Sequence, residues 1–412
     1  MTLVDSNSNR LPCYSYAPRE TPLTEYGPSM SVTALEPRPN PLPAPARIGM
    51  RIAQVDTPAL LLDLDAFERN LRRLVDSLQG RQIRVRPHAK SHKCPQIALR
   101  QIALGAVGVC CQKVSEAEAL VHGGVRDVLV ANEVIGAPKL ARLAALARHA
   151  RVGVCVDDLG NVDDLQGAAQ AAGTRLDVYV EVNVGANRCG VEAGEPVLAL
   201  ARAISGAGAL RFAGIHAYHG GAQHLRAPAE RSAAIAQAVD KVQRSVALIE
   251  AAGMKVEIVT GAGTGTYTLE ATSGVYNEIQ PGSYVFMDAD YGRNLGDDGS
   301  PVHFFEHSLF ILATVMSHVL PQRAVVDVGL KAHSVDSGMP TVVGVPGARY
   351  ARASDEHGAI ELDGPGKLAL GEKVKLIPGH CDPTVNLYDW LVCHRGDRVE
   401  DIWPISARGA FY

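Results

Sequence analysis

The sequence lacks the features that mark several classes of protein. Its 40 lysines and arginines are outnumbered by 44 aspartates and glutamates, so no basic excess suggests a nucleic-acid partner. The apolar runs, such as 59–62 and 309–316, are far too short to span a bilayer. The eight cysteines form no CxxC pair and no regular framework, which favours reduced thiols over a disulfide scaffold. No secretory leader pattern opens the chain, so we expect a cytoplasmic enzyme without membrane contact.

What the chain does have is enough apolar sequence for a large core and one unusual terminal arm. Of its 412 residues 47% are hydrophobic and 20% are charged, which excludes wholesale disorder. Nine of the 24 prolines fall within residues 1–45. Because proline removes backbone donors and blocks helix, we expect residues 1–50 to be an extended or disordered arm with no chemical role.

From residue 57 onward, short β-branched runs alternate with helical stretches rich in alanine and leucine. The runs that we expect to be strands are 83–87, 106–110, 127–131, 152–156, 176–182, 211–217, 256–260 and 275–280. Helical segments between them include 94–104, 114–123, 138–149 and 226–252. This alternation predicts an α/β fold with a parallel sheet, and eight strand–helix units predict a closed (β/α)8 TIM barrel over residues 57–300. An open doubly wound sheet is the alternative.

Beyond residue 300 the pattern changes. Apolar strands at 309–318, 323–328, 341–345, 373–378 and 398–403 follow one another without helices, which predicts a C-terminal all-β domain over residues 301–412.

Polar residues follow the predicted barrel strands, where barrel enzymes carry their active sites. The loop after the seventh strand contains Gly263, Thr264 and Gly265, and the eighth strand is followed by Gly282 and Ser283. Glycines let backbone N–H groups approach an anion and hydroxyls add donors, so this position in a barrel favours a phosphate site.

A lysine after the first strand, opposite a phosphate site, points to pyridoxal 5'-phosphate (PLP). Lys90 would form the Schiff base with the cofactor aldehyde while the glycine-rich loop holds the phosphate. Neighbouring cations, namely His88, His92 and Lys93, are expected to lower its pKa and favour the free amine. Lys93 is the competing candidate, and a solvated basic turn is the alternative interpretation.

His380 and Asp382 form a second constellation, in the predicted β domain. In an extended stretch they would point to one face, with Cys381 on the other. An imidazole and a carboxylate suit manganese, magnesium, cobalt or zinc, and so small a ligand set leaves positions for water and substrate. A polar turn near Pro383 is the alternative.

Five strings resemble the D-threonine aldolase/D-serine dehydratase family, which are PLP enzymes of the alanine racemase-type fold. The resemblance runs from about residue 57 to the C-terminus and is closest to the 3-hydroxy-D-aspartate (β-hydroxyaspartate) aldolases. The strings are RPHAKSHK (86–93), GVCCQKVSEAE (108–118), GAGTG (261–265), MDADYG (287–292) and PGHCDPT (378–384).

The resemblance implies a role for each residue that matches a motif. Lys90 would be the Schiff-base lysine, His224 the histidine near the metal and the substrate hydroxyl, and Tyr291 a residue facing the site. It also implies that the first strand after residue 57 joins the β domain and that the enzyme is a homodimer. The remaining implied residues are Gln112, Arg188 and Tyr218 at the cofactor ring, Gly263, Thr264, Gly265, Gly282 and Ser283 near its phosphate, and His380 and Asp382 as metal ligands.

The function expected from these features is a PLP- and divalent-metal-dependent retro-aldol cleavage of a D-β-hydroxy-α-amino acid. The substrate would be 3-hydroxy-D-aspartate, giving glycine and glyoxylate, or D-threonine, giving glycine and acetaldehyde. His224 would take the hydroxyl proton, and His92, Lys93 or Arg293 would hold a side-chain carboxylate.

Two alternatives remain open at this point. The first is a D-serine or D-3-hydroxyaspartate dehydratase, although that branch tends to carry His-x-Cys where this chain has His380-x-Asp382. The second is a PLP-binding homeostasis protein without turnover, against which the predicted β domain argues.

Overall fold

The computed structural model describes residues 43–363 and 367–412, so most of the predicted arm lies outside the described residues. In this part of the chain no helix is both long and apolar enough to cross a membrane. The helices are α1 Leu64–Ser77, α2 Pro95–Ala103, α3 Val114–His122, α4 Ala137–Leu146, α5 Leu159–Ala172, α6 Glu195–Gly206, α7 Pro228–Ala251, α8 Tyr267–Thr272 and α9 Cys381–Val385.

The strands fall into two sets. The first set, in the barrel, is β2 Arg84–Val85, β3 Val109–Cys111, β4 Asp127–Glu133, β5 Arg151–Val156, β6 Leu176–Glu181, β7 Leu210–Ala217, β8 Ile258–Gly261 and β9 Glu278–Ile279. The second set is β1 Ala59–Asp63, β10 Leu309–Leu320, β11 Arg323–Val326, β12 Thr341–Val343, β13 Ala348–Ala353, β14 Gly358–Leu362, β15 Lys373–Ile377, β16 Trp390–Arg395 and β17 Arg398–Pro404.

The first set forms a parallel sheet in the order β2-β9-β8-β7-β6-β5-β4-β3. Its two end strands meet, because Val107 N donates to Val85 O at 2.9 Å and Cys110 N donates to Pro87 O at 2.9 Å. The ring is therefore closed, which confirms the predicted barrel and rejects the open sheet.

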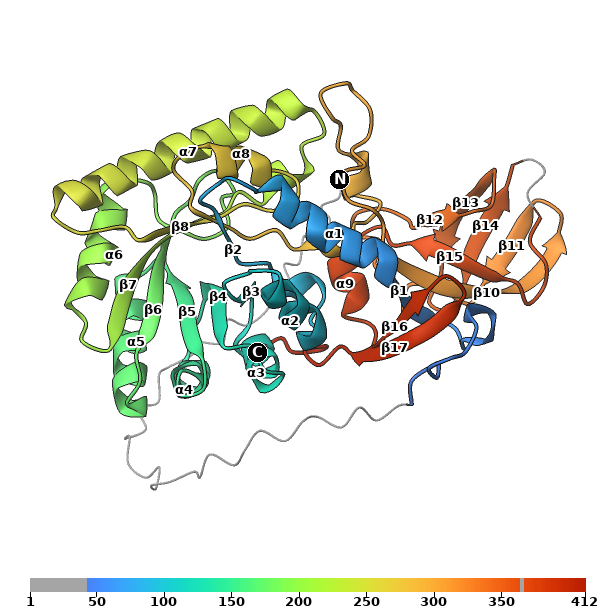
Figure 1. The fold of residues 1–412 in the computed structure, drawn as a ribbon, viewed down its shortest axis with the longest axis horizontal. Coiled ribbons are helices and arrows are strands. Elements are labelled where there is room, and N and C mark those ends of the chain that lie inside the picture. Colours follow the sequence, from blue (N-terminus) through green and yellow to red (C-terminus); the bar gives the residue numbers. More distant parts are fainter. Residues whose placement is uncertain (1–42, 364–366) are drawn as a thin grey trace, which may run out of the picture. The chain divides into compact units, whose positions relative to one another are not determined.

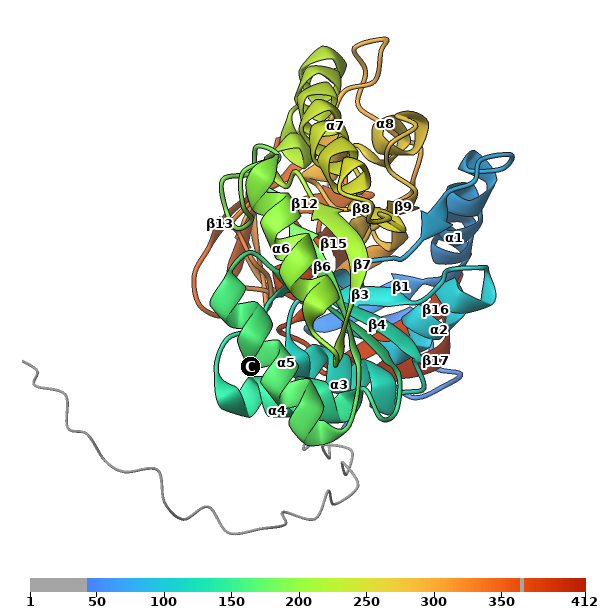
Figure 2. The same ribbon diagram turned by 90° about the vertical axis from the view of Figure 1, so that its left-hand side faces the viewer.

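Helices cover the outside of this barrel. Figure 2 shows α5 and α6 in front of strands β6 and β7, and these helices pack on each other and on the strands. In α4 the side chains of Leu140, Leu143 and Leu146 are buried, which gives the helix one apolar face. The Asp158 side chain accepts from Asn161 N at 3.0 Å and so caps the start of α5.

The second set forms a nine-stranded sheet that draws strands from both sides of the barrel sequence (Figure 1). Strand β1 pairs antiparallel with β10 and parallel with β16. Its residues Ala59, Leu60, Leu61 and Leu62 are fully buried, because both faces of this central strand are covered. The chain thus enters this sheet before it builds the barrel.

The loop after the last barrel strand lies beside the loop that links β15 to α9. Ala289 N donates to Pro378 O at 3.0 Å, and Asp290 N donates to Gly379 O at 3.2 Å. One hydrophobic cluster also joins residues of both sheets, such as Ile279 in β9 and Leu376 in β15. These contacts bring the end of the barrel next to the segment that carries His380 and Asp382.

A buried ion pair ties the first barrel strand to its neighbours. Arg86 Nε lies 2.9 Å from Glu278 Oε1, and both side chains are almost completely buried. Arg86 Nη1 also lies 2.6 Å from Asp127 Oδ1, at the start of β4. These two charges raise the pKa of Arg86 although burial opposes them, so the guanidinium stays charged.

We expect Arg86→Met to lower the free energy of unfolding by about 3–5 kcal/mol, because Glu278 would keep a buried charge without its main partner. Arg84→Met is the matched control, since Arg84 is partly exposed and lies 3.2 Å from the other oxygen of Glu278. It should cost about 1 kcal/mol or less. Urea unfolding of both variants measures this, and equal losses would contradict the assignment.

Candidate active site

Lys90 lies in a short 3₁₀ turn, Ala89–Ser91, directly after the first barrel strand. His88 shapes this turn, because its Nδ1 accepts from Lys90 N at 3.3 Å and its carbonyl accepts from Ser91 Oγ at 3.1 Å. The Lys90 amine lies 3.6 Å from Asp382 Oδ2, and its side chain remains 38% accessible. The amine is therefore both accessible and close to the predicted metal pair.

The expectation that neighbouring cations lower the pKa of Lys90 is wrong. Burial does act to lower it, but the Asp382 carboxylate outweighs burial and the pKa is raised. Burial also lowers the pKa of His88 well below its ordinary value and that of His92 to about 4, so these two rings are neutral. The charge that determines the direction of the Lys90 pKa shift is the Asp382 carboxylate, which lies in α9 between two strands of the second sheet.

Lys93, the competing lysine, is engaged elsewhere. Its buried Nζ lies 2.9 Å from Glu116 Oε1. The other oxygen of Glu116 accepts from Gln112 N at 2.7 Å and Lys113 N at 3.1 Å. Lys93 thus belongs to the ion pair that anchors the turn after β3, which carries Gln112.

The residues expected around a cofactor ring gather near Lys90. Gln112 Nε2 lies 2.8 Å from His88 Nε2. The Arg188 guanidinium lies 5.8 Å from the centre of the Tyr218 ring and 3.8 Å from Glu181 Oε1. Burial raises the pKa of Tyr218, and the positive charges of Lys90 and Arg188 oppose that rise, as expected for neighbours.

The predicted phosphate loops meet at the end of strands β8 and β9. Thr264 Oγ1 accepts from Tyr284 N at 3.0 Å and joins the two loops. Among residues 43–363 and 367–412, no hydrogen bond engages the backbone N–H of Gly263, Thr264, Gly282 or Ser283, although all four residues are buried. Buried amides of this kind need an acceptor, and a phosphate fits them.

Gln223 is a supporting residue that sequence reasoning missed. Its Oε1 accepts from Gly265 N at 3.0 Å. A Cβ at position 263 would lie 2.5 Å from the same oxygen, so a side chain there would displace the Gln223 amide. The repeated glycines were the signal in the sequence, but they do not reveal which residue approaches them.

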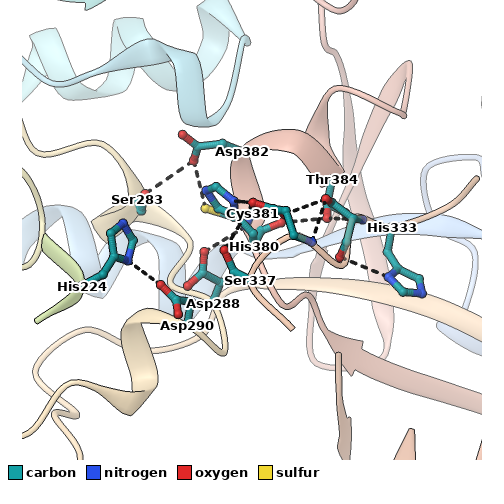
Figure 3. A network of polar contacts seen from close by, with 12 residues as sticks. His224, Ser283, Asp288, Asp290, His333, Ser337, His380, Cys381, Asp382 and Thr384 are labelled. Atoms are coloured by element: carbon teal, nitrogen blue, oxygen red, sulfur yellow. Dashed lines mark hydrogen bonds and ion pairs between the residues drawn. The ribbon is translucent and has the colours of Figure 1, made fainter. Parts of the chain in front are cut away.

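His380 and Asp382 lie next to each other, but not in the expected extended stretch. His380 is extended, whereas Asp382 lies in the first turn of α9, which corrects that expectation. Figure 3 shows the His380 ring beside the Asp382 carboxylate. Burial lowers the pKa of His380, but Asp382 and the hydrogen-bonded Asp336 outweigh it and the pKa is raised.

The donor set of this pair fits a divalent ion. It offers an imidazole and a carboxylate, the ligand types that manganese, magnesium, cobalt and zinc accept. Ser283 Oγ lies 3.5 Å from Asp382 Oδ1, so the pair adjoins the predicted phosphate loop. Cys381 is buried, burial raises the pKa of its thiol well above the usual value, and its Sγ donates to Asp382 Oδ1 at 3.2 Å.

His224 faces the same region from the barrel side. Its Nδ1 contacts Asp290 Oδ2, and its ring lies 5.3 Å from that of Tyr291, centre to centre. Asp290 also pairs with Arg226 and Arg293. Burial would raise the pKa of Asp290, but these partners lower it, so its carboxylate is charged.

Of the three candidates for a substrate carboxylate, Arg293 remains the most suitable. His92 is neutral and fully buried, and Lys93 is paired with Glu116. Arg293 pairs with Asp290, but half of its side chain is accessible.

Asp288 is a second residue that sequence reasoning missed. Its fully buried carboxylate accepts from Tyr291 N and from Cys381 N, each at 2.9 Å. It therefore links the loop after the barrel to the loop that carries His380 and Asp382 (Figure 3). An acidic residue in the apolar string 284–289 was the signal, and its partner in α9 was not visible from the sequence.

The described part of the chain thus has a lysine after the first barrel strand, amides left unbonded within it after the last two barrel strands, and a His–Asp pair between β15 and β16. Together with the two sheets, these features define a barrel enzyme of the alanine racemase type. The alanine racemase N-terminal domain family matches residues 62–290, and the putative serine dehydratase domain family matches residues 308–394.

Known proteins agree with this class over nearly the whole chain. The chain is 50% identical over 372 residues to 3-hydroxy-D-aspartate aldolase of Paracoccus denitrificans (strain Pd 1222), covering 89% of this chain and 96% of that protein. It is 52% identical to the crystal structure of D-threonine aldolase from Filomicrobium marinum, with a TM-score of 0.86, covering 90% and 100%. Identity to D-threo-3-hydroxyaspartate dehydratase of Delftia sp. (strain HT23) is 28% over 355 residues, covering 80% and 92%.

The chain therefore belongs to the D-threonine aldolase/D-serine dehydratase family of the alanine racemase-type fold, as its motifs indicated.

Glu270, which lies behind the glycine-rich loop 261–265, makes the stability of the folded chain depend on pH. Thr266 Oγ1 donates to Glu270 Oε1 at 2.8 Å, and Gln223 Nε2 donates to Thr266 Oγ1 at 2.8 Å. Burial raises the pKa of Glu270 from 4.5 to about 8. The folded chain thus keeps a proton that the unfolded chain releases, so stability falls as pH rises from about 4.5 to about 8, by roughly 1.4 kcal/mol per pH unit.

We expect Glu270→Gln, which is neutral at every pH, to raise Tm by several degrees at a pH above that range. The difference should vanish at a pH well below 4.5, where the folded and unfolded states of the wild type are both protonated. Thermal melting across this range measures it, with the exposed Glu195→Gln as control. A difference that does not change with pH would contradict a protonated Glu270.

Proposed function

We propose that this chain is a PLP- and divalent-metal-dependent aldolase that cleaves a D-β-hydroxy-α-amino acid into glycine and an aldehyde. The observation that carries the proposal is the approach of Lys90 Nζ to within 3.6 Å of Asp382 Oδ2, beside His380. Lys90, the amine that would bind the cofactor, therefore lies beside His380 and Asp382, the residues that would bind an ion at the substrate hydroxyl. The identity to proteins named 3-hydroxy-D-aspartate aldolase and D-threonine aldolase supports the same reaction.

The two groups would divide the chemistry between them. When bound, PLP supplies an electron sink for the carbanion left by Cα–Cβ cleavage, and the ion, manganese, magnesium, cobalt or zinc, supplies a Lewis acid at the hydroxyl. Lys90 would hold the cofactor at its aldehyde, and His380 and Asp382 would hold the ion. Gln112, Arg188 and Tyr218 would border the ring, and the free amides of Gly263, Thr264, Gly282 and Ser283 would bind the phosphate.

His224 is suited to take the hydroxyl proton. Its Nδ1 faces the charged Asp290 carboxylate, which has no proton to give, so the ring must donate from Nδ1. When the ring is uncharged, its lone pair is therefore on Nε2, which can accept a proton. Tyr291, packed on the same ring, would hold His224 in this orientation.

The proposal includes a homodimer that acts in the cytoplasm. The seven cysteines in the described part of the chain are all free thiols, which suits a reducing compartment. Sedimentation of the purified protein would measure its oligomeric state.

Product analysis tests the reaction. With PLP and Mn²⁺ added, we expect D-threonine or a 3-hydroxy-D-aspartate diastereomer to give glycine and one equivalent of acetaldehyde or glyoxylate. Chromatography after incubation with and without a chelator measures this, and the L-enantiomers serve as controls. Ammonia with a keto acid would instead identify a dehydratase, and no turnover of any of these substrates would favour a homeostasis role.

Lysine variants test the cofactor site. We expect Lys90→Ala to lose the yellow absorbance of the bound cofactor and its covalent attachment, because the attached amine is gone. Borohydride fixation followed by peptide mass spectrometry locates the link, and Lys113→Ala, an exposed lysine nearby, is the matched control. A link retained in the Lys90→Ala protein would assign the role to Lys93.

A further inference from the structure

The Nδ1 atom of His380 already has a partner in the protein. It lies 2.7 Å from Asp336 Oδ2, on the segment that precedes β12. A carboxylate accepts hydrogen bonds and does not donate them, so Nδ1 must carry the proton of this contact. In the neutral ring, Nε2 then keeps a lone pair and is the only nitrogen available to an ion.

Asp336 is itself held in place by hydrogen bonds from residues close to it in the sequence. Ser334 Oγ donates to Asp336 Oδ1 at 2.6 Å, and Ser337 Oγ donates to Oδ2 at 3.3 Å. A surface carboxylate without such bonds would sample several rotamers. Here these bonds fix the Asp336 carboxylate, which accepts from His380, without a bound ion.

The segment 333–338 is tied to the His380 segment at several points. Ser334 N donates to Thr384 Oγ1 at 3.2 Å, and that hydroxyl donates to His380 O at 2.7 Å. A Cβ at Gly379 would lie 2.0 Å from Gly338 O, so the two backbones touch. Figure 3 shows His333, Ser337 and Thr384 in the same network as His380.

The same segment is also tied to the barrel side of the site. Arg293 Nη2 donates to Ser337 O at 2.8 Å and pairs with Asp290, the partner of His224. The segment that orients His380 therefore shares a partner with the proposed base. An isolated surface ion pair would have no such connections.

We propose that Asp336 is a positioning residue for the divalent-ion site: it fixes the tautomer and orientation of His380 so that Nε2 faces the ion. This inference rests on the proposed function. Carboxylate partners of this kind typically change metal affinity by roughly 10–100-fold when removed, because the free ring must be ordered at the moment of binding. Asp336 touches neither substrate nor cofactor in this arrangement.

The test is Mn²⁺ titration of the full-length, PLP-loaded protein after chelator treatment, followed by calorimetry. We expect Asp336→Ala to weaken Mn²⁺ binding by roughly 10–100-fold, with the cofactor absorbance unchanged and with kcat largely restored at saturating Mn²⁺. Asp336→Asn keeps an acceptor oxygen without the charge and should lie between the wild type and Asp336→Ala. It also carries the test if the alanine variant folds poorly.

Two controls separate this inference from the function on which it rests. Asp355→Ala removes an exposed acid of the same β domain and should leave Mn²⁺ affinity unchanged. His380→Ala should abolish stoichiometric binding. If the wild type binds no Mn²⁺, or His380→Ala binds it normally, the proposed metal site fails and this inference fails with it. If His380→Ala abolishes binding while both Asp336 variants stay within about twofold of the wild type, the positioning role alone is overturned.

Discussion

The alignment of the lysine with the His–Asp pair depends on the buried carboxylate of Asp288. It accepts one amide from its own loop, at Tyr291, and one from the other sheet's segment, at Cys381. Two backbone hydrogen bonds between 289–290 and 378–379 run beside it. Burial raises the pKa of Asp288 and the two amides oppose that rise, so removing the contact would leave polar groups unsatisfied at about 1–3 kcal/mol each. This contact fixes the position of the loop after the barrel relative to the loop that carries His380 and Asp382.

Burial and pairing also determine which cationic groups in the site are available. The rings of His88 and His92 are neutral, and Lys93 is held by Glu116. Lys90 keeps its charge through Asp382, and the side chains of Lys90 and Arg188 remain substantially accessible. Residues 88–93 contain two histidines and two lysines, but only the Lys90 amine is charged and accessible in the site.

Much of this arrangement could be predicted from the sequence, because the signals are local. Strand–helix alternation predicted the barrel, and glycines and hydroxyls after its last two strands predicted the loops near Ser283. The central position of β1 was not visible in the residues themselves, since periodicity reveals a strand but not its partners. The family resemblance implied only that this strand joins the β domain. Strands β13, β14 and β16 were not identified either. Burial alternates only weakly along β13 and is nearly continuous along β16, and β14 alternates over only five residues.

The errors at the site have the same physical origin. The pKa of Lys90 was expected to fall because only sequence neighbours were counted, whereas Asp382 approaches from the other sheet. Asp336 and Asp290 were missed because each acts on a histidine far away in the sequence. Short-range patterns specify elements and reactive residue types, but the groups that orient those residues come from tertiary contacts.

Dividing the site between two sheets has a consequence for how its chemistry can vary. Lys90 and the loops of Thr264 and Ser283 follow barrel strands, and the His–Asp pair lies at the start of α9, between β15 and β16. If Asp382 is a metal ligand, as proposed, a change at this position would alter the ion site and leave the hydrogen bonds at Lys90 N and Thr264 Oγ1 in place. Such a division allows one fold to serve both aldolases and dehydratases. The barrel residues can stay constant while the groups on the segment between β15 and β16 change.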